Sequence, residues 1–386
     1  MSIRSQQRSL HIVFVLYRYF PFGGLQRDML RIARACVERG VSIKIFCAEW
    51  EGELPAGIAV ERLPVSGFTN HARNRSFAEA VKKYLQREAV DLVVGFNKMP
   101  SLDVYYAADT CFKAKLMQER LPQLRFLPRY RQYLRDEKAV FGRDSHTKIL
   151  AIAQRSVDEY EKYYVGAAQR CTVLPPGINT DRRAGSNALQ QREDFRREWR
   201  LSEKDRLLLS IGSGFRTKGV DRTIRALAAL PVAILQHARL MVIGQDRPDK
   251  FLRLATQLGV EKRIQFLAGR DDIPQFLLGA DVLIHPAYRE NTGTVLLEAA
   301  VAGLPVLTTA VCGYSHYLRD YACGVVVDEP FLQTALNDAL KNMLQDDAQR
   351  AQWRKNALLM AEAADIYSLF DRAADFIVAA AGKKNT

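Results

Sequence analysis

Short apolar runs alternate with helical patterns along the whole chain, and this alternation limits the fold more than any other feature. An amphipathic pattern such as LQRDMLRIARACVERG, which starts at residue 25 and stops at Gly40, separates one apolar run from the next. Continuous apolar strands linked by helices are typical of parallel sheets that are covered on both faces. We therefore predict an α/β protein whose strands lie at residues 11–17, 41–48, 89–96, 104–109, 148–153, 206–212, 238–244, 263–269, 281–286, 304–309 and 323–328.

The same order of strands and helices occurs twice, on either side of a break at LPPGINTDRRAGSNA (174–188). The 386 residues are enough for two ordinary domains. We predict two doubly wound, Rossmann-like domains with parallel sheets, formed by residues 1–175 and 176–364. A last helix pattern covers about 349–380, and we expect the C-terminal helix (365–386) to pack back on the first domain. Doubly wound sheets bind ligands at the carboxyl ends of their strands, so the predicted site is the cleft between the domains.

Charge and composition narrow the range of partners. Lys and Arg exceed Asp and Glu by ten in residues 1–170 and by only three in the remainder. The N-terminal half is therefore expected to meet an anionic partner, for which nucleic acid and an anionic membrane face both qualify. No apolar run reaches the roughly 18 residues of a spanning helix, and the apolar N-terminal stretch is interpreted as a first strand and not as a signal peptide. Six scattered cysteines without zinc-site spacing favour a reducing cytoplasm.

The strongest candidate for chemistry is the segment HPAYRENTGTVLLEAAVAGLPVLTT (285–309). Glu290 lies in a polar loop after a strand, and Glu298 lies eight positions later, in an apolar helix that begins near Gly293. A carboxylate in so apolar a helix is costly unless it accepts hydrogen bonds or meets a cation or a ligand hydroxyl. The start of that helix offers N–H groups and a positive dipole to a diphosphate. We predict that Glu290 faces a sugar and Glu298 the hydroxyls of a ribose; the alternative is a capping acid and a buried acid with structural partners only.

A second candidate is IGSGFRTKGVDR (211–222), in which a strand leads through a Gly-rich turn to a helix. Lys218, and less strongly Arg216, would place fixed cations beside the helix start, which suits a diphosphate leaving group. Solvated loop charges are the alternative. The segment is not a Walker loop, and Thr217 stands where the third glycine of G-x-G-x-x-G would be, which argues against an ATPase and a dinucleotide dehydrogenase.

Further candidates are weaker when taken singly. Gly23 and Gly24 in YFPFGGLQRD let a loop lie against a phosphate or a sugar, and Asp28 would accept a hydrogen bond from an acceptor hydroxyl. Arg182 and Arg270 are candidate donor contacts, with an ordinary surface role as the alternative. The chain has no D-x-D triplet, so we expect neither a metal nor another cofactor, and lysine, arginine and helix dipoles would replace the cation.

The segment 112–141 is basic, aromatic-rich and amphipathic, because residues 113–138 hold eight Lys/Arg against three Asp/Glu among leucines and tyrosines. Such a segment lies well at an anionic bilayer surface, where each cation gains roughly 1 kcal/mol. Nucleic acid would attract the same charges, but no recognised binding motif accompanies them, so we expect no nucleic-acid partner. A solvated helix face is the alternative. The expected membrane contacts are Lys113, Lys115, Arg120, Arg125, Phe126, Arg129, Tyr130, Arg131 and Arg135.

Together these motifs resemble a known family. The pair Glu290 and Glu298, the Lys218 motif and the glycine loop at 23–24 are similar to motifs of the retaining glycosyltransferases of family 4, which have the GT-B fold of two Rossmann-like domains and an interdomain cleft. More narrowly, YRYFPFGGLQRD, VVGFNKMPSLDVYYAAD, LLEAAVAGLPVLTTAVCGYSHY and the basic segment resemble members that build the core of lipopolysaccharide. The similarity runs from about residue 11 to about residue 378.

The resemblance implies retaining transfer of a hexose, first of all glucose from UDP-glucose, to an inner-core heptose of lipopolysaccharide. It also implies a peripheral enzyme on the cytoplasmic face of the inner membrane of a Gram-negative cell. The first domain would bind the acceptor and the second the donor. The expected catalytic residues are Glu290, Asp28 and Lys218. The expected donor contacts are Gly23, Gly24, Arg182, Arg216, Lys218, Arg270, Thr292, Gly293, Thr294, Val295 and Glu298.

Two departures from the family pattern leave the donor sugar open. Thr217 stands where an arginine usually accompanies the lysine, and Glu290-Asn291-Thr292 replaces a loop of small residues against the sugar. Transfer of N-acetylgalactosamine is therefore an alternative to glucose. A sugar-nucleotide epimerase and a membrane-binding protein with a decayed site are rivals on the same scaffold. Because Glu290 lies in a polar loop, we expect its replacement by alanine to abolish transfer with little loss of stability.

Overall fold

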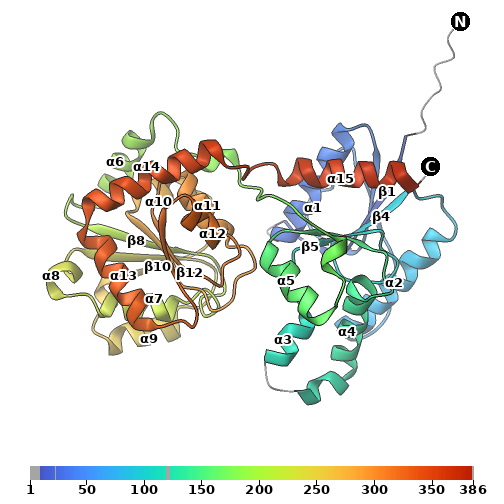
Figure 1. Ribbon diagram of the computed structural model, residues 1–386, viewed down its shortest axis with the longest axis horizontal. Coiled ribbons are helices and arrows are strands. Elements are labelled where there is room, and N and C mark those ends of the chain that lie inside the picture. Colours follow the sequence, from blue (N-terminus) through green and yellow to red (C-terminus); the bar gives the residue numbers. More distant parts are fainter. Residues whose placement is uncertain (1–8, 22, 119–121, 385–386) are drawn as a thin grey trace, which may run out of the picture. The chain divides into compact units, whose positions relative to one another are not determined.

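The computed structural model describes residues 9–21, 23–118 and 122–384, and it contains two compact units, each built on one parallel sheet (Figure 1). Unit 1 comprises Met1–Gly177 and Ser368–Thr386, and unit 2 comprises Ile178–Tyr367. Two α/β units with parallel sheets confirm the predicted fold class.

The sheet of unit 1 has the strand order β3-β2-β1-β4-β5-β6-β7. Its strands are β1 (His11–Tyr19), β2 (Ser42–Trp50), β3 (Ala59–Arg62), β4 (Leu92–Gly95), β5 (Val104–Ala107), β6 (Lys148–Ala151) and β7 (Cys171–Val173). The α-helices are α1 (Gly24–Glu38), α2 (Asn70–Leu85), α3 (Phe112–Gln118), α4 (Pro128–Phe141), α5 (Gln154–Tyr163) and α15 (Leu369–Lys384). The chain builds the sheet outward from β1 in one direction and then from β4 in the other, so the order reverses between these two strands.

Alternate residues of β1 face opposite sides of this sheet, as the two-residue period of a strand requires. Ile12, Phe14 and Leu16 pack with residues of α1 and α15. Val13 and Val15 pack with residues of α2, α4 and α5 on the other face. Helix α15 lies beside α1, although the two helices are far apart in the sequence (Figure 1).

The sheet of unit 2 has the strand order β10-β9-β8-β11-β12-β13. Its strands are β8 (Arg206–Ile211), β9 (Ala238–Ile243), β10 (Ile264–Leu267), β11 (Val282–His285), β12 (Val306–Thr309) and β13 (Gly324–Val327). The α-helices are α6 (Ala188–Glu198), α7 (Val220–Ala228), α8 (Val232–Leu235), α9 (Asp249–Gln257), α10 (Ile273–Gly279), α11 (Thr294–Val301), α12 (Ser315–Asp320), α13 (Gln333–Gln345) and α14 (Asp347–Ala363).

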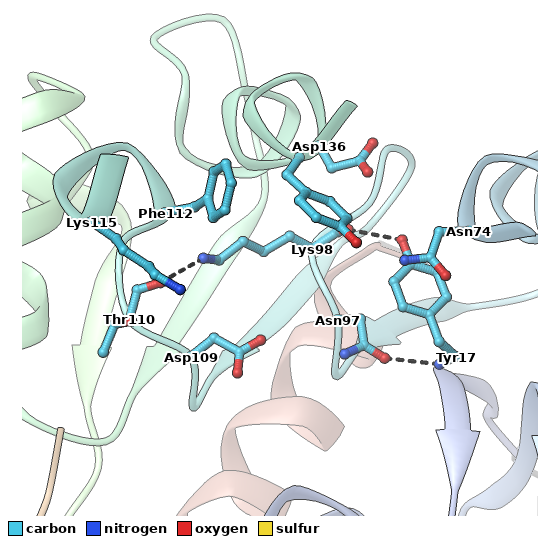
Figure 2. Close-up of a pocket in the computed structure, with 10 residues that line it drawn as sticks. Tyr17, Asn74, Asn97, Lys98, Asp109, Thr110, Phe112, Lys115 and Asp136 are labelled. Atoms are coloured by element: carbon cyan, nitrogen blue, oxygen red, sulfur yellow. Dashed lines mark hydrogen bonds between the residues drawn. The ribbon is translucent and has the colours of Figure 1, made fainter. Parts of the chain in front are cut away.

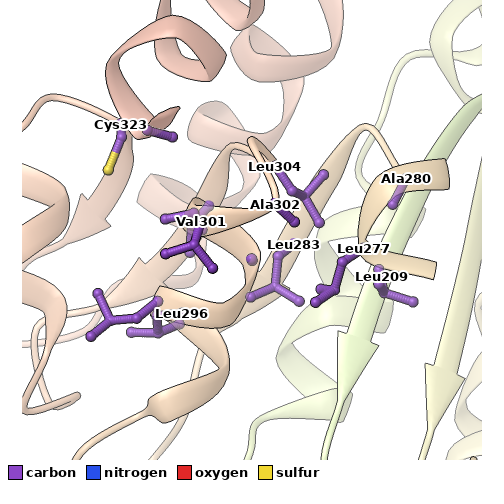
Figure 3. Packing of buried hydrophobic residues seen from close by; sticks show 14 of the residues in the cluster. Leu209, Leu277, Ala280, Leu283, Leu296, Val301, Ala302, Leu304 and Cys323 are labelled. Atoms are coloured by element: carbon purple, nitrogen blue, oxygen red, sulfur yellow. The ribbon is translucent and has the colours of Figure 1, made fainter. Parts of the chain in front are cut away.

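Helix α11 is anchored in the core of unit 2. Leu296 and Val301 of this helix pack with Leu283 of β11 and Leu277 of α10, and all four side chains are fully buried (Figure 3). Burying such a side chain stabilises the fold by about 1.5–3 kcal/mol. The packing fixes where the first turn of α11 and the side chain of Glu298 lie.

The structure corrects the sequence-based elements at three places. The strands β3 and β7 have no counterpart among the predicted strands, because they are short edge strands with exposed residues and no apolar run. The helix pattern at 349–380 forms two helices, α14 and α15. The residues between these two helices are not helical, because the backbone there forms hydrogen bonds with residues 176–178. Ile178 N–H donates to Ile366 O (2.9 Å), and Leu369 N–H donates to Pro176 O (3.3 Å).

Candidate active site

The loop between β8 and α7 carries Lys218 and is fixed from within unit 2. The carboxylate of Asp246 accepts hydrogen bonds from the N–H groups of Gly214 and of the next residue, at 2.9 and 2.7 Å. Gly219, directly before α7, has a φ of 77°, and a Cβ on it would lie 2.0 Å from the carbonyl oxygen of Pro286. Only glycine fits a positive φ with another backbone so near. The loop is therefore held against the end of β11.

The loop between β11 and α11 is tied to the first loop by backbone and side-chain contacts. Tyr288 N–H donates to Thr217 O at 2.8 Å. The guanidinium of Arg222, on α7, lies 3.6 Å from the centroid of the Tyr288 ring and donates to the carbonyl oxygens of Pro286 (3.2 Å) and Ala287 (3.0 Å). A planar guanidinium can stack and donate in its plane at the same time. These contacts join the two loops into one double loop.

Lys218 and Glu290 meet in this double loop. The Lys218 ammonium forms an ion pair with Glu290 Oε2, and Nε2 of His285 lies 3.3 Å from the same oxygen. The side chain of Glu290 is 12% exposed and that of Lys218 is 24% exposed. Burial alone would raise the pKa of Glu290, but the hydrogen bond from His285 and the charge of Lys218 outweigh it and hold this pKa at about 2. Glu290 is therefore a fixed negative charge at neutral pH.

His285 supports this charge from below, at the end of β11. Its side chain is fully buried, and burial lowers its pKa, against the raising effect of Glu290. The ring is neutral at pH 7, so Nε2 carries the proton that the ionised Glu290 accepts. Within the described residues Nδ1 has no hydrogen-bond partner. The sequence motifs assign His285 no role. The sequence signal that could have indicated one is a histidine that ends an apolar strand five residues before Glu290.

The first turn of α11 borders the double loop. Gly293 precedes the helix with a φ of 79°, and no side chain caps the helix start. Tyr314 N–H donates to Thr292 O at 2.7 Å, which holds the turn before the helix, while Thr294 is exposed and Val295 half-buried. Helix starts carry N–H groups and a partial positive charge, so this turn suits an anionic ligand.

Glu298 and Arg182 lie near each other at the side of α11. Arg182 Nε is 4.0 Å from Glu298 Oε1 and 3.9 Å from Asp181 Oδ1, and both side chains of the Arg182–Glu298 pair are mostly buried. Nε and Nη1 of Arg182 have no hydrogen-bond partner within the described residues. Two buried donors without a partner are rare in proteins, and they leave Arg182 able to bind a ligand.

The two other predicted donor arginines have different surroundings. Arg216 is exposed on the β8–α7 loop. Arg270 forms two hydrogen bonds to the carboxylate of Asp272, at 2.7 and 2.6 Å, and its guanidinium lies 5.1 Å from the ring of Phe276. The structure thus brings Lys218, Glu290 and the start of α11 together, whereas Arg270 is held by a neighbour in its own loop.

The predicted residues of unit 1 lie at the start of α1. A Cβ on Gly23 would lie 1.9 Å from Oε1 of the flexible Gln26 side chain, whereas Gly24 is exposed to open space. Asp28 accepts a hydrogen bond from Tyr106 Oη at 2.8 Å. Burial raises the pKa of Asp28, against the opposing effects of Tyr106 and the neighbouring arginines.

Comparisons with known proteins identify the family. The family model described as Glycosyltransferase Family 4 matches residues 22–182, and the model described as Glycosyl transferases group 1 matches residues 191–360. The lipopolysaccharide glucosyltransferase WaaG of Escherichia coli (strain K12) is 44% identical over 366 residues, which are 95% of this chain and 98% of the relative. The chain belongs to this family of glycosyltransferases.

A solved structure agrees with this identification, and two more distant proteins are also similar to the chain. The crystal structure of WaaG, a glycosyltransferase involved in lipopolysaccharide biosynthesis, covers 95% of the chain and 99% of its own with a TM-score of 0.86. The D-inositol 3-phosphate glycosyltransferase of Salinispora tropica is 27% identical, over 87% of this chain and 76% of the relative. Anabaena HepE, solved with UDP-glucose, shares the fold at 19% identity, with a TM-score of 0.72 over 96% of this chain and all of the other.

The basic segment of this glycosyltransferase comprises α3, the 3-10 helix Pro122–Phe126 and α4. Phe126 (67%) and Leu127 (49%) are exposed, and so are Arg129, Arg131 and Arg135. Arg131 and Arg135 also line a hollow of about 500 Å³, which they share with Arg75 of α2.

The other predicted membrane contacts differ among themselves. Lys115 is exposed, and the half-buried Tyr130 packs on Phe112 with a ring distance of 5.7 Å. Lys113 instead turns toward α5, because its ammonium donates to Tyr163 O (3.3 Å) and lies 5.1 Å from the ring of Tyr164. Arg120 and the side chain of Arg125 lie outside the described residues.

The described part of the chain lacks two features that bear on the glycosyltransferase. No group of three or more His, Cys, Asp or Glu side chains there could hold a metal ion. Among the same residues, no helix is both long enough and apolar enough to cross a membrane.

Proposed function

We propose that this glycosyltransferase transfers a hexose, in the first instance glucose from UDP-glucose, to an inner-core heptose of lipopolysaccharide with retention of configuration. The observation that carries the proposal is the Lys218–Glu290–His285 cluster beside the starts of α7 and α11. The 44% identity to a lipopolysaccharide glucosyltransferase supports the choice of sugar and acceptor.

Unit 2 would bind the nucleotide sugar. The ammonium of Lys218 has three protons, so it can hold Glu290 and still donate to a phosphate oxygen. The uncapped start of α11 would take the other side of the diphosphate. Glu298 would accept from the ribose hydroxyls, and Arg182 would donate to the donor from Nε and Nη1, which have no hydrogen-bond partner among the described residues.

The reaction would use the same charges. The acceptor hydroxyl attacks C1 of the donor sugar on the face from which UDP leaves, the bond from C1 to the phosphate oxygen breaks, and the leaving phosphate takes the hydroxyl proton. Lys218 and the start of α11 stabilise the negative charge that grows on the phosphate. Glu290, kept ionised by His285 and Lys218, stabilises the positive charge that develops on the sugar ring. In unit 1, Asp28 would orient the acceptor hydroxyl, for which Tyr106 already fixes its carboxylate.

Unit 1 would also contact the membrane that contains the acceptor. Three exposed arginines of α4 and the exposed Phe126 and Leu127 combine cations with apolar side chains on one segment. Such a combination binds anionic lipid and inserts shallowly. We therefore propose a peripheral enzyme on the cytoplasmic face of the inner membrane.

One assay tests the proposed function. The purified enzyme is incubated with truncated lipopolysaccharide and either UDP-glucose or UDP-N-acetylgalactosamine, with and without EDTA, and the product is analysed by mass spectrometry and NMR. We expect acceptor-dependent release of UDP, a gain of one glucose in α-linkage, and no effect of EDTA, because Lys218 and the helix starts would replace a cation. A gain of N-acetylhexosamine would reassign the donor. Conversion of the UDP-sugar without acceptor would indicate an epimerase, and EDTA inhibition reversed by Mg²⁺ or Mn²⁺ would contradict the metal-independent mechanism.

A further inference from the structure

Unit 1 contains a hollow of about 330 Å³ at the carboxyl ends of its central strands (Figure 2). Tyr17 comes from the end of β1, Asn97 follows β4 by two residues, and Asp109 follows β5 by two residues. Asn97 Oδ1 accepts from Tyr17 N–H at 2.8 Å, which joins the two strand ends. The strand order reverses between β1 and β4, and open parallel sheets bind small molecules at such a point. The volume is in the range of small-molecule sites, roughly 300–1,000 Å³.

Helices α2, α3 and α4 supply the walls of this pocket. Phe112 and Tyr133 contribute aromatic rings, which contact each other edge to face at 5.3 Å between centroids. Asn74 of α2 and Asp136 of α4 lie across from Asp109 (Figure 2). Asp136 Oδ1 accepts from Gln132 Nε2 at 2.8 Å, and the described residues provide no hydrogen bond to its Oδ2. The pocket therefore combines an apolar wall with amide and carboxylate groups that can still bind a ligand.

The charges of the lining decide which ligand fits. Lys98 crosses the pocket to donate to Thr110 O at 2.9 Å (Figure 2). Its charge is balanced by the buried Glu137, at 2.8 Å. The remaining charged residues of the lining are one lysine, Lys115, and two carboxylates, Asp109 and Asp136. A phosphate would meet a surface without a net positive charge. Hydroxyl groups, in contrast, donate well to carboxylate and amide oxygens.

We propose that this pocket binds one uncharged sugar residue of the acceptor, with its hydroxyls on Asn74, Asp109 and Asp136 and one ring face on the Phe112–Tyr133 wall. The proposal rests on the proposed function, because it assigns the acceptor of that reaction to a defined site. It makes Asp136 and Asn74 determinants of acceptor affinity, in helices that the donor chemistry does not use.

Glu137 keeps the pocket preorganised. This carboxylate is fully buried and accepts from the N–H groups of Phe112 (2.6 Å) and Lys113 (3.0 Å), from Tyr164 Oη (2.9 Å) and from Lys98. It thereby ties the start of α3 and the side chain of Lys98 to α4. Two adjacent residues of α4 thus have different roles. Glu137 fixes the pocket wall through its hydrogen bonds, and Asp136 lines the pocket and would bind the sugar.

The test measures steady-state kinetics with a soluble acceptor, so that membrane binding does not contribute. Deacylated, truncated lipopolysaccharide oligosaccharide serves as acceptor and UDP-glucose as donor, for Asn74→Ala, Asp136→Asn and the control Asp144→Asn, an exposed carboxylate outside the pocket. Loss of a hydrogen bond to a charged or amide group weakens binding by about tenfold or more. We expect the acceptor KM to rise at least tenfold in both pocket variants, while the donor KM stays within twofold and the control matches the wild type.

Two kinetic outcomes overturn the proposal. One is an unchanged acceptor KM in both pocket variants, and the other is an equal rise in the donor KM, which would indicate general damage. If the wild-type enzyme does not use this oligosaccharide, the proposed acceptor is wrong, and the pocket is judged by saturation-transfer NMR with a free methyl heptoside. A signal that Asn74→Ala and Asp136→Asn abolish then supports the sugar pocket, and no signal with the wild type overturns it.

Discussion

At the scale of single residues, the candidate site depends on the mostly buried ion pair between Lys218 and Glu290. Glu290 is mostly buried, so its charge persists only because Lys218 and His285 compensate for desolvation. From the sequence alone, where Glu290 lies in a polar loop, we expect its replacement to cost little stability. The buried ion pair changes this expectation. Removing the carboxylate leaves a half-buried ammonium and a buried imidazole without their partner, so stability should fall as well as activity.

We expect Glu290→Gln to lower kcat by about 100-fold or more, since one preorganised electrostatic group contributes on this order. The free energy of unfolding should fall by about 1–3 kcal/mol at pH 7, because Lys218 and His285 lose a charged partner. The pKa of Glu290 is lowered from 4.5 to about 2, so its contribution to stability is present above about pH 4.5 and is lost as the pH falls toward 2. Urea unfolding of the folded variant at pH 7 and at lower pH checks this, with exposed Glu203→Gln as control. An unchanged kcat in the Glu290→Gln variant would show that the Glu290 charge does not take part in the reaction.

Asp136 should show the opposite pH dependence. Burial raises its pKa from 3.8 to about 6, against the weaker lowering effect of the Gln132 hydrogen bond and nearby arginines. The folded state therefore binds this proton more tightly than the unfolded chain, and the contribution of Asp136 to stability is lost as the pH rises through about 6. We expect Asp136→Asn to be more stable than the wild type at pH 7.5, by about 1–3 kcal/mol, and the difference to vanish near pH 4. Equal stabilities of Asp136→Asn and the wild type at both pH values would show that burial does not raise the pKa of Asp136. Asp144→Asn is again the control.

At the scale of elements, the double loop depends on the close approach of α7 and the end of β11. Gly219 is the contact point, because its missing Cβ leaves room for the carbonyl oxygen of Pro286. The arrangement converts two separate strand ends into one surface that carries Lys218 and Glu290. A change at Gly219 should therefore affect the reaction without touching a side chain of the site.

We expect Gly219→Ala to lower kcat/KM for the UDP-sugar by about 100-fold, because the loops must separate to admit a methyl group and the Lys218–Glu290 pair moves with them. Gly259→Ala is a matched control: this glycine of unit 2 also has a positive φ (72°), but it faces open space. It should show only the backbone strain of about 1 kcal/mol in urea unfolding and normal kinetics. Similar kinetic losses in both variants would mean that the contact with Pro286 is unimportant.

At the scale of the whole molecule, the uneven charge predicts that unit 1, and not unit 2, would contact the proposed anionic membrane surface. The excess of ten cations lies in residues 1–170, and the exposed arginines of α4 are accompanied by exposed apolar side chains. Outside residues 1–170, Lys and Arg exceed Asp and Glu by only three. Membrane attraction, if it is local, should therefore follow α4 and not the total charge.

Neutralising Arg129, Arg131 and Arg135 to Gln should release the enzyme from vesicles that contain phosphatidylglycerol, whereas the same change at Arg247, Lys250 and Arg253 of unit 2 should not. Binding of the wild type should weaken with salt, because exposed charges are screened over about 8–10 Å near physiological ionic strength. Co-sedimentation measures binding, and transfer to a soluble acceptor checks that the α4 variant stays active. Equal release by both triple variants would indicate a non-local charge effect, and loss of soluble activity would mean that α4 shapes the acceptor site through these arginines.

The sequence by itself determined the fold class, most strands, the positions of Glu290 and Lys218 in loops that follow strands, and the position of Glu298 in an apolar helix. These features are local: an apolar run, a glycine before a helix and a carboxylate in an apolar helix are visible within a dozen residues. Tertiary structure alone decided the contacts between distant segments. It brought His285 and Lys218 onto one oxygen of Glu290, turned Lys113 inward to α5, divided the last helix pattern in two, and assembled the unit 1 pocket from three strand ends and three helices. Such contacts follow from strand order and packing, which no short pattern contains, because a side chain's partner across a sheet is set by the fold and not by its neighbours in the chain.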